Sequence, residues 1–313
     1  MNLKNFKIAI VTPVYEDRES LKMLLEDIEK LTFDVTVFAV DDGSVNKPLQ
    51  REDISQFRKV SIKIIKLTRN LGHQKAIAVG LNYVYHNYKN EFDFVVTMDS
   101  DGEDIPAQIS NLIESLLREK KDIAVASRKK RKETISFKIF YFFYKLIFAI
   151  LTGKKINFGN FIVFQSKLLK RIISMNEIWL HLAASVLLSK LRIAYVPTDR
   201  GSRYRDKSKM NFVGLVLHGF RALMVFAEDV LVRIGIFSTF VACLSVIGII
   251  IAFILKFWGN ATPGWFSIVV GVLFVVFLLT GILSLISLML TGVLKNNTVS
   301  NRNYEFLIDE VYE

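Results

Sequence analysis

Short apolar runs alternate with segments of helical periodicity along residues 7–127. The apolar runs predict buried strands at residues 7–14, 35–40, 61–67, 94–98 and 123–127. Between them, apolar residues spaced three and four positions apart predict helices at residues 20–30, 72–88 and 105–119. Strands that alternate with helices usually form a mostly parallel sheet with helices packed against it. The pattern therefore predicts an α/β fold for this part of the chain.

The C-terminal part of the chain contains two long segments without any charged side chain. They cover residues 234–255 and 257–294, with Lys256 between them. A helix rises about 1.5 Å per residue, so each segment is long enough to cross a hydrocarbon layer about 30 Å thick. Trp258 and Trp265 flank the connecting turn, and tryptophan favours the membrane–water interface. We therefore predict two transmembrane helices within residues 234–294.

Basic residues predict the orientation of this hairpin. Its outer ends are flanked by Arg221, Arg233, Lys295 and Arg302. The connecting turn offers only Lys256. Because basic flanks stay on the cytoplasmic side, we expect both termini in the cytoplasm and the hairpin in a bacterial inner membrane. The run at residues 7–14 ends at a proline without a cleavage-like site, which excludes a signal peptide.

The chain carries an excess of positive charge. The chain has 313 residues, a net charge of +11 and a single cysteine, Cys243, which excludes a disulfide scaffold. Residues 134–152 are rich in aromatic side chains and follow a basic run at 128–132, which is typical of an amphipathic helix at a bilayer surface. The alternative is a core helix preceded by a solvated basic loop. Residues 211–233 form a second apolar segment before the hairpin. Because the hairpin and the aromatic segment account for the excess of positive charge, we expect a bilayer as partner and no nucleic acid.

Aspartates follow two of the predicted strands. Asp41 and Asp42 follow the strand at 35–40, and Asp99 and Asp101 follow the strand at 94–98. Ligands of parallel sheets bind beyond the carboxyl ends of the strands. The Asp-x-Asp turn brings together two hard oxygen donors, which suit Mg²⁺ or Mn²⁺, and such a cation can hold a diphosphate. The alternative is that these aspartates only cap turns and helices.

Four motifs stand in an order and spacing that resemble the family 2 glycosyltransferases of the GT-A fold. They lie at residues 11–17 (VTPVYED), 40–44 (VDDGS), 69–72 (RNLG) and 98–101 (MDSD). With the C-terminal hairpin, the chain is most similar to polyprenyl-phosphate glycosyltransferases, relatives of dolichyl-phosphate mannose synthase. The resemblance implies a Rossmann-like GT-A catalytic domain in the cytoplasm. The expected segments are this domain at 1–210, a juxtamembrane amphipathic helix at 211–233, the membrane pair at 234–294 and a cytoplasmic tail at 295–313.

The resemblance also implies roles for individual residues. Those expected to bind the nucleotide-sugar donor are Pro13, Tyr15, Asp41, Asp42, Arg69, Gly72, Asp99 and Ser100. The expected metal ligands are Asp99, Asp101 and Glu103. Residues expected near the acceptor phosphate are Arg128, Arg131 and Ser208. The expected catalytic residues are Asp101, Arg203 and Lys209, the last two from an Arg-x-x-Gly-x-Ser-Lys motif that closes over phosphates.

The chain departs from the family pattern at three places. Asp206 stands where the phosphate-closing motif usually has glycine. Asn160 lies where the family often has an aspartate or arginine, so a catalytic carboxylate is not expected there. Glu16 and Asp17 replace a more usual Asn-Glu pair, which predicts an altered contact with the base.

The expected chemistry follows from the charge on the leaving group. A nucleoside diphosphate departs with growing negative charge, which a metal ion, Arg203 and Lys209 would stabilise. A hydroxyl acceptor needs a general base, whereas a lipid phosphate is already ionised and needs only positioning. No convincing acid–base pair follows Asp101, which fits a phosphate acceptor. Together with the Asp-x-Asp turn, the Arg203–Lys209 loop and the hairpin, the resemblance implies an inverting transfer of a hexose from a UDP- or GDP-sugar to polyprenyl phosphate.

Two other functions stay open at this point. One is transfer to a hydroxyl of a glycan or glycolipid, and the other is a non-catalytic, membrane-tethered nucleotide-sugar binder. The oligomeric state is open as well. Glycines of the hairpin could pack its two helices together or serve a homo-oligomer, namely Gly235, Gly248, Gly271 and Gly281.

Overall fold

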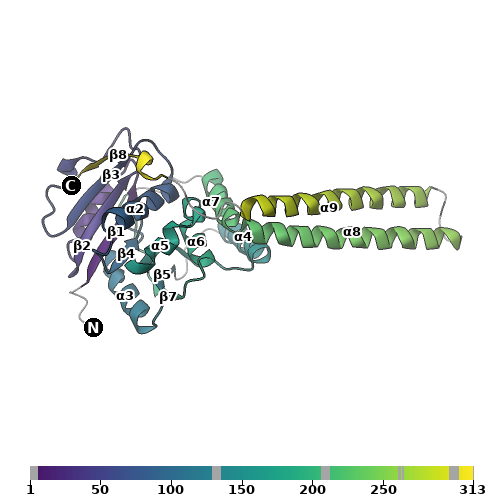
Figure 1. The fold of residues 1–313 in the computed structure, drawn as a ribbon, viewed down its shortest axis with the longest axis horizontal. Helices are drawn as coiled ribbons and strands as arrows, with labels where there is room; N and C mark the ends of the chain where they lie inside the picture. The colour runs from purple at the N-terminus through teal and green to yellow at the C-terminus, as the bar shows by residue number, and fades with distance from the viewer. Residues whose placement is uncertain are drawn as a thin grey trace. The chain divides into compact units, whose positions relative to one another are not determined.

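The computed structural model describes residues 6–128, 135–205, 212–259, 262, 264–295 and 303–312. The chain divides into two compact units. Unit 1 comprises Met1–Tyr141, Lys155–Val225 and Val299–Glu313, and unit 2 comprises Phe142–Lys154 and Phe226–Thr298. Figure 1 shows the layered sheet of unit 1 and the paired long helices of unit 2.

The described strands of unit 1 form one eight-stranded mixed sheet in the order β7-β5-β6-β4-β1-β2-β3-β8 (Figure 1). The strands are β1 (Lys7–Val14), β2 (Asp34–Asp41), β3 (Ser61–Leu67), β4 (Phe94–Thr97), β5 (Ile123–Arg128), β6 (Phe158–Gln165), β7 (Ile193–Thr198) and β8 (Ile308–Tyr312). β1 is parallel to β2 and β4, β2 to β3, and β5 to β7, whereas β6 and β8 run antiparallel to their neighbours. The predicted α/β fold with a mostly parallel sheet is confirmed.

Helices cover both faces of this sheet. α1 (Arg18–Ile28) and α3 (Ile109–Arg118) pack on one face, where the core includes Ile8 and Ile10. α2 (His73–Asn87), α5 (Leu169–Ile173) and α6 (Leu182–Leu188) pack on the other face, where the core includes Ala9 and Val11. Successive residues of β1 thus point to opposite cores, as the pleat of a strand requires. Burial on both sides explains why the central strands are continuous apolar runs in the sequence.

The remaining elements are shorter or belong to the C-terminal part of the chain. α7 (Phe212–Val225) is the last helix of unit 1 before the chain enters the hairpin. α4 (Ile135–Thr152) begins in unit 1 and continues in unit 2 from Phe142 onward. Single 3₁₀ turns are η2 (Arg51–Asp53), η3 (Pro106–Gln108), η4 (Ser166–Leu168), η5 (Asn176–Trp179) and η6 (Glu305–Leu307).

Unit 2 is a helical hairpin of α8 (Ala227–Phe257) and α9 (Trp265–Lys295). Both helices are long and apolar enough to cross a membrane, with mean hydropathies of 2.7 and 2.9. The most apolar stretches are 17% and 0% buried within the protein, so these are not core helices of a soluble fold. The hairpin predicted for residues 234–294 is confirmed as a pair of long apolar helices.

Small and polar residues lie between α8 and α9. A Cβ at Gly235 would contact Ser287, and one at Gly248 would lie 2.9 Å from Leu273. The hydroxyl groups of Thr239 and Ser284 are 3.1 Å apart across the hairpin. A Cβ at Gly271 or Gly281 would meet no atom within 4 Å, so of the four glycines only the first two pack the hairpin itself.

The described half of α4 has an exposed apolar surface. Phe142, Leu146 and Ile150 are spaced one helical turn apart and are 63%, 45% and 60% exposed. The backbone carbonyl of Ile150 accepts a hydrogen bond from Arg233 at the start of α8. The helix predicted at 134–152 therefore exists at Ile135–Thr152, and its place in a membrane interface stays a prediction.

The C-terminal strand β8 was not predicted, because residues 295–313 were expected to form only a tail. β8 pairs antiparallel with β3, from Ile64–Tyr312 to Leu67–Ile308. Just before it, Tyr304 is buried and stacks on His86 of α2 at 5.1 Å between ring centroids. Five residues of mixed polarity at a sheet edge carry too little periodicity to indicate a strand.

α2 packs tightly against β1 and β2 at Gly80. A Cβ there would lie 2.5 Å from Val11 Cγ1 and 2.9 Å from Val40 Cγ2. Gly80→Ala should therefore lower the free energy of unfolding of unit 1 by about 1–3 kcal/mol through overpacking, although alanine is the better helix former. Gly271→Ala, at an open helical position, is the matched control for urea unfolding in detergent. Equal or greater stability of the Gly80 variant would contradict this packing.

Candidate active site

The Asp-x-Asp turn follows β4 and is fixed by its own hydrogen bonds. The backbone N–H of Asp99 donates to Asp104 Oδ2 at 3.0 Å, and that of Glu103 donates to Asp101 Oδ1 at 3.1 Å. Ser100 Oγ donates to the carbonyl of Pro13 on β1 at 3.0 Å. These contacts hold the turn at the carboxyl edge of the sheet, where the sequence placed it.

The segment after β7 lies directly on this turn. Gly201 N–H donates to the Glu103 carbonyl at 3.0 Å, and Tyr204 N–H donates to the Asp101 carbonyl at 2.9 Å. A Cβ at Gly201 would lie 2.1 Å from the carbonyl oxygen of Gly102, so only glycine permits this backbone contact. The packing brings residues about a hundred positions apart into one site.

Two arginines of this segment pair with acidic side chains of the turn. Arg203 Nε lies 2.8 Å from Glu103 Oε1, and Arg203 Nη2 lies 3.1 Å from Asp101 Oδ2. Arg200 pairs with the second oxygen of Glu103. Burial alone would raise the pKa of Glu103, but the two arginines outweigh it and hold that pKa below its usual value. Glu103 is thus an ionised anchor for both arginines.

Asp99 is held from the other side by a buried amide network. Asn160 Nδ2 lies 3.3 Å from Asp99 Oδ1 and 2.8 Å from His73 Nε2. His73 Nε2 itself lies 3.1 Å from Asp99 Oδ1. Gln74 donates to Asn160 Oδ1 at 3.1 Å and accepts the backbone N–H of Leu182 at 2.7 Å. Asn160 therefore positions Asp99 and His73, a role that the sequence analysis did not assign to it.

Asp41 and Asp42 organise the loops beside this turn. Asp41 accepts the backbone N–H groups of Ser44 and Leu49 at 3.0 and 2.8 Å. Asp42 accepts those of Leu71 and Gly72 at 2.7 and 2.9 Å. Both carboxylates are almost fully buried. They thereby fix the motifs at 42–49 and 69–72, and their contact with a donor stays a prediction.

The structure places the other predicted residues as follows. Tyr15 is 47% exposed, and Arg69 is exposed on the loop before α2. The backbone of Arg128 ends β5, paired with Thr198. The side chain of Arg128 and the whole of Arg131, Asp206, Ser208 and Lys209 lie outside the described residues.

The fit of a divalent cation depends on Asp99 and Asp101. Within the described ranges, no three histidine, cysteine or acidic side chains form a group that could hold a metal ion. Glu103, the third expected ligand, is committed to Arg200 and Arg203. Burial, followed by the charge of Asp99, raises the pKa of Asp101, and a cation between the two carboxylates would relieve this repulsion. Asp99 and Asp101 are thus the carboxylates that would hold a cation, and metal binding stays a prediction.

A histidine pair joins α6 to α7. His181 Nε2 and His218 Nε2 are 3.1 Å apart. His181 also caps α6, because its Nδ1 accepts the backbone N–H of Ala184 at 3.3 Å. Its Nε2 therefore carries the hydrogen and donates to His218. Burial, followed by the charge of His218, lowers the pKa of His181 to about 3, so the pair is neutral. Their separation of 37 positions in the sequence gave no sign of this contact.

The fold and this edge of the sheet define a GT-A-type nucleotide-sugar enzyme. A family model described as Glycosyl transferase family 2 matches residues 9–173. Since this is more than half of the chain, the protein belongs to glycosyl transferase family 2 and is a glycosyltransferase. The resemblance found in the sequence is thereby confirmed.

Individual relatives support the same assignment. The chain is 27% identical to the uncharacterized glycosyltransferase YkoT of Bacillus subtilis over 281 residues, which cover 85% of this chain and 81% of the relative. It is 30% identical to an undecaprenyl-phosphate 4-deoxy-4-formamido-L-arabinose transferase of Proteus mirabilis over 133 residues, 41% of this chain and 39% of the relative.

Among solved structures, the fold is similar to that of glucosyl-3-phosphoglycerate synthase from Mycobacterium tuberculosis, solved in complex with Mn²⁺, UDP-glucose and phosphoglyceric acid. The TM-score is 0.51 and the identity 16%, and the match covers 73% of this chain and 80% of that one. The structural likeness shows the fold.

The histidine pair predicts acid sensitivity of unit 1. Below about pH 6.5 the unfolded chain protonates His181 while the folded chain does not, so stability falls as the pH drops from 6.5 towards 3. His181→Asn keeps a side-chain cap for Ala184 but removes the titration. Between pH 7 and pH 5 the wild type should lose about 2 kcal/mol more than this variant.

Trp179 gives a local readout of this effect. Urea unfolding followed by tryptophan fluorescence, in a Trp258→Phe, Trp265→Phe background, isolates its signal within unit 1. Equal loss of stability in both proteins over this pH range would show that His181 is not a buried neutral group.

Proposed function

We propose that the protein is a membrane-anchored, metal-dependent, inverting glycosyltransferase that transfers a hexose from a UDP- or GDP-sugar to polyprenyl phosphate. The observation that carries this proposal is the joint presence of the Asp99–Asp101 pair, with Arg203 against it, and a hairpin of two membrane-length helices. The named activity of the Proteus mirabilis relative supports the acceptor class.

The donor diphosphate would bind at the carboxyl edge of the sheet. Asp99 and Asp101 would hold Mg²⁺ or Mn²⁺, which supplies Lewis-acid stabilisation of the departing diphosphate. Arg203, 3.1 Å from Asp101, adds a second positive charge on the same side. Glu103 keeps Arg203 in place through its own ion pair. Lys209, from the same sequence motif as Arg203, would add a further positive charge to stabilise the departing diphosphate.

The acidic groups around the site favour an acceptor that is already ionised. Glu103 is ion-paired with two arginines, and Asp42 accepts two backbone N–H groups. Desolvation opposes protonation of His73, but the charge of Asp99 and its hydrogen bond to that carboxylate outweigh it and raise the pKa. His73 Nε2 already faces Asn160 Nδ2 and Asp99 Oδ1, so we do not assign it the role of a general base. A phosphate acceptor needs no proton removed, so positioning suffices.

Chain connectivity supports a catalytic unit on one side of the membrane. The chain leaves unit 1 after Val225, forms the two helices of unit 2 and returns to unit 1, where β8 pairs with β3. If both helices cross the membrane, the even number of crossings would return the chain to the side from which it entered. With the basic flanks of the hairpin, this supports a cytoplasmic catalytic unit and an interfacial role for α4 and α7.

The proposal predicts a metal-dependent formation of lipid-linked sugar. Full-length protein in detergent, with undecaprenyl phosphate, Mn²⁺ and a panel of UDP- and GDP-sugars, should yield one labelled lipid whose sugar is released by mild acid. Asp101→Asn should lower the rate by about 10²-fold or more, because the leaving group loses its charge stabilisation. Asp309→Asn, on the exposed edge of β8, is the matched control and should keep full activity.

The outcomes separate the competing functions. An acid-stable product would indicate transfer to a hydroxyl group and contradict a phosphate acceptor. Full activity of the Asp101 variant would contradict the metal-assisted mechanism. No transfer from any donor, with retained nucleotide binding, would indicate a non-catalytic binder.

A further inference from the structure

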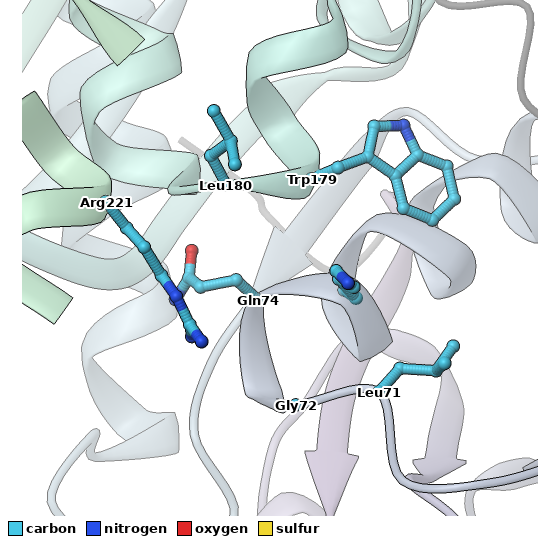
Figure 2. A pocket seen from close by; sticks show the side chains of 7 residues that line it. Leu71, Gly72, Gln74, Trp179, Leu180 and Arg221 are labelled. Atoms are coloured by element: carbon cyan, nitrogen blue, oxygen red, sulfur yellow. The ribbon is translucent and has the colours of Figure 1, made fainter. Parts of the chain in front are cut away.

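A small cavity lies at the start of α2, and no predicted site residue except Gly72 contributes to it. Its volume is about 140 Å³, and its walls are Leu71, Gly72, Gln74, Lys75, Trp179, Leu180 and Arg221. In Figure 2, Arg221 extends towards Gln74, and Leu180 and Trp179 lie above Gln74 in this view. The cavity is smaller than a pocket for a whole substrate, and its size suits one phosphate group with the first carbons attached to it.

The lining combines positive charge with apolar surface. Among the residues that the structure describes, neither Arg221 nor Lys75 forms an ion pair with an acidic side chain. Trp179 is almost fully buried, and Leu71 and Leu180 add aliphatic surface beside it. Two cations without acidic partners attract an anion, and the apolar wall accepts a hydrocarbon chain attached to it.

The cavity adjoins the proposed donor site through two residues. Gln74 lines the cavity and holds Asn160, which contacts Asp99. His73, the residue between Gly72 and Gln74, lies 3.1 Å from Asp99. The cavity and the Asp-x-Asp turn are therefore linked through the side chains of Gln74, Asn160 and His73.

α7 connects the cavity to an apolar surface. Arg221 reaches the cavity from this helix, and His218, one turn earlier, docks the helix on α6. Beside Arg221, α7 exposes apolar side chains at spacings of four, three and four residues, namely Val213, Leu217, Phe220 and Met224, each at least half exposed. Such spacing places them on one helical face. A lipid lying along this face would bring its phosphate to Arg221.

We infer that Arg221 and Lys75 form the subsite for the phosphomonoester of the lipid acceptor, with Trp179 and Leu180 against its first hydrocarbon units. The inference rests on the proposed function, and it assigns acceptor binding to residues outside the Arg128, Arg131 and Ser208 set. Both residues are binding residues, so their loss should weaken acceptor binding and leave donor binding unchanged.

The test uses full-length protein in detergent and two charge-neutral variants, Arg221→Gln and Lys75→Gln. Each should raise KM for undecaprenyl phosphate on the order of ten-fold, with KM for the donor unchanged, because a hydrogen bond to a charged group is lost. Arg221→Lys should recover most of the loss. Lys170→Gln, an exposed cation on α5, is the matched control and should keep both KM values.

A binding measurement separates this inference from the proposed function. Farnesyl phosphate, farnesol and inorganic phosphate are titrated into the wild type and both variants without a donor. The inference predicts that farnesyl phosphate binds more tightly than either other compound, and that only its affinity falls in the variants, even if no sugar is transferred.

Three results would overturn the inference. Unchanged KM and affinity in both variants would remove Arg221 and Lys75 from the acceptor site while transfer to lipid still stands. Equal binding of farnesol would exclude phosphate recognition. Equal binding of inorganic phosphate would exclude a lipid as the source of the phosphate.

Discussion

The electrostatic balance at the carboxyl edge of the sheet is the constraint on which the site depends. Buried carboxylates are stable only where opposite charges or hydrogen-bond donors compensate them. Glu103 is compensated by Arg200 and Arg203, whereas at Asp42 burial outweighs two backbone N–H donors and raises the pKa. At Asp101, burial and then the charge of Asp99 outweigh the pairing with Arg203 and raise the pKa. The two carboxylates of this turn thus repel each other within one short segment, where a cation and an anionic donor would bind together.

The sequence predicted the central fold well because its strands are buried on both faces. β1 to β4 are short apolar runs, with helical periodicity between β1 and β2 and between β3 and β4, a pattern typical of α/β folds. The short helices α5 and α6 have too few turns for a clear period, and β6 and β7 were not predicted either. β8 was missed because its pairing with β3 spans nearly the whole chain and leaves no local trace.

The site was predictable where it depends on local motifs. The Asp-x-Asp turn and Arg203 follow from motifs in the sequence, and the structure brings Arg203 to Asp101. The network of Gln74, Asn160 and His73 was not predictable, because Asn160 is more than eighty positions from its partners in α2. The same holds for Arg221 and Lys75, which come together only when α7 docks on α6.

Crystals of the protein grown with Mn²⁺ and UDP test the central claim most directly, by anomalous scattering at the manganese edge. The account predicts one strong peak between Asp99 and Asp101, with diphosphate oxygens completing its coordination and Arg203 facing the same diphosphate. A diphosphate bound elsewhere, or manganese bound away from these two carboxylates, would contradict it.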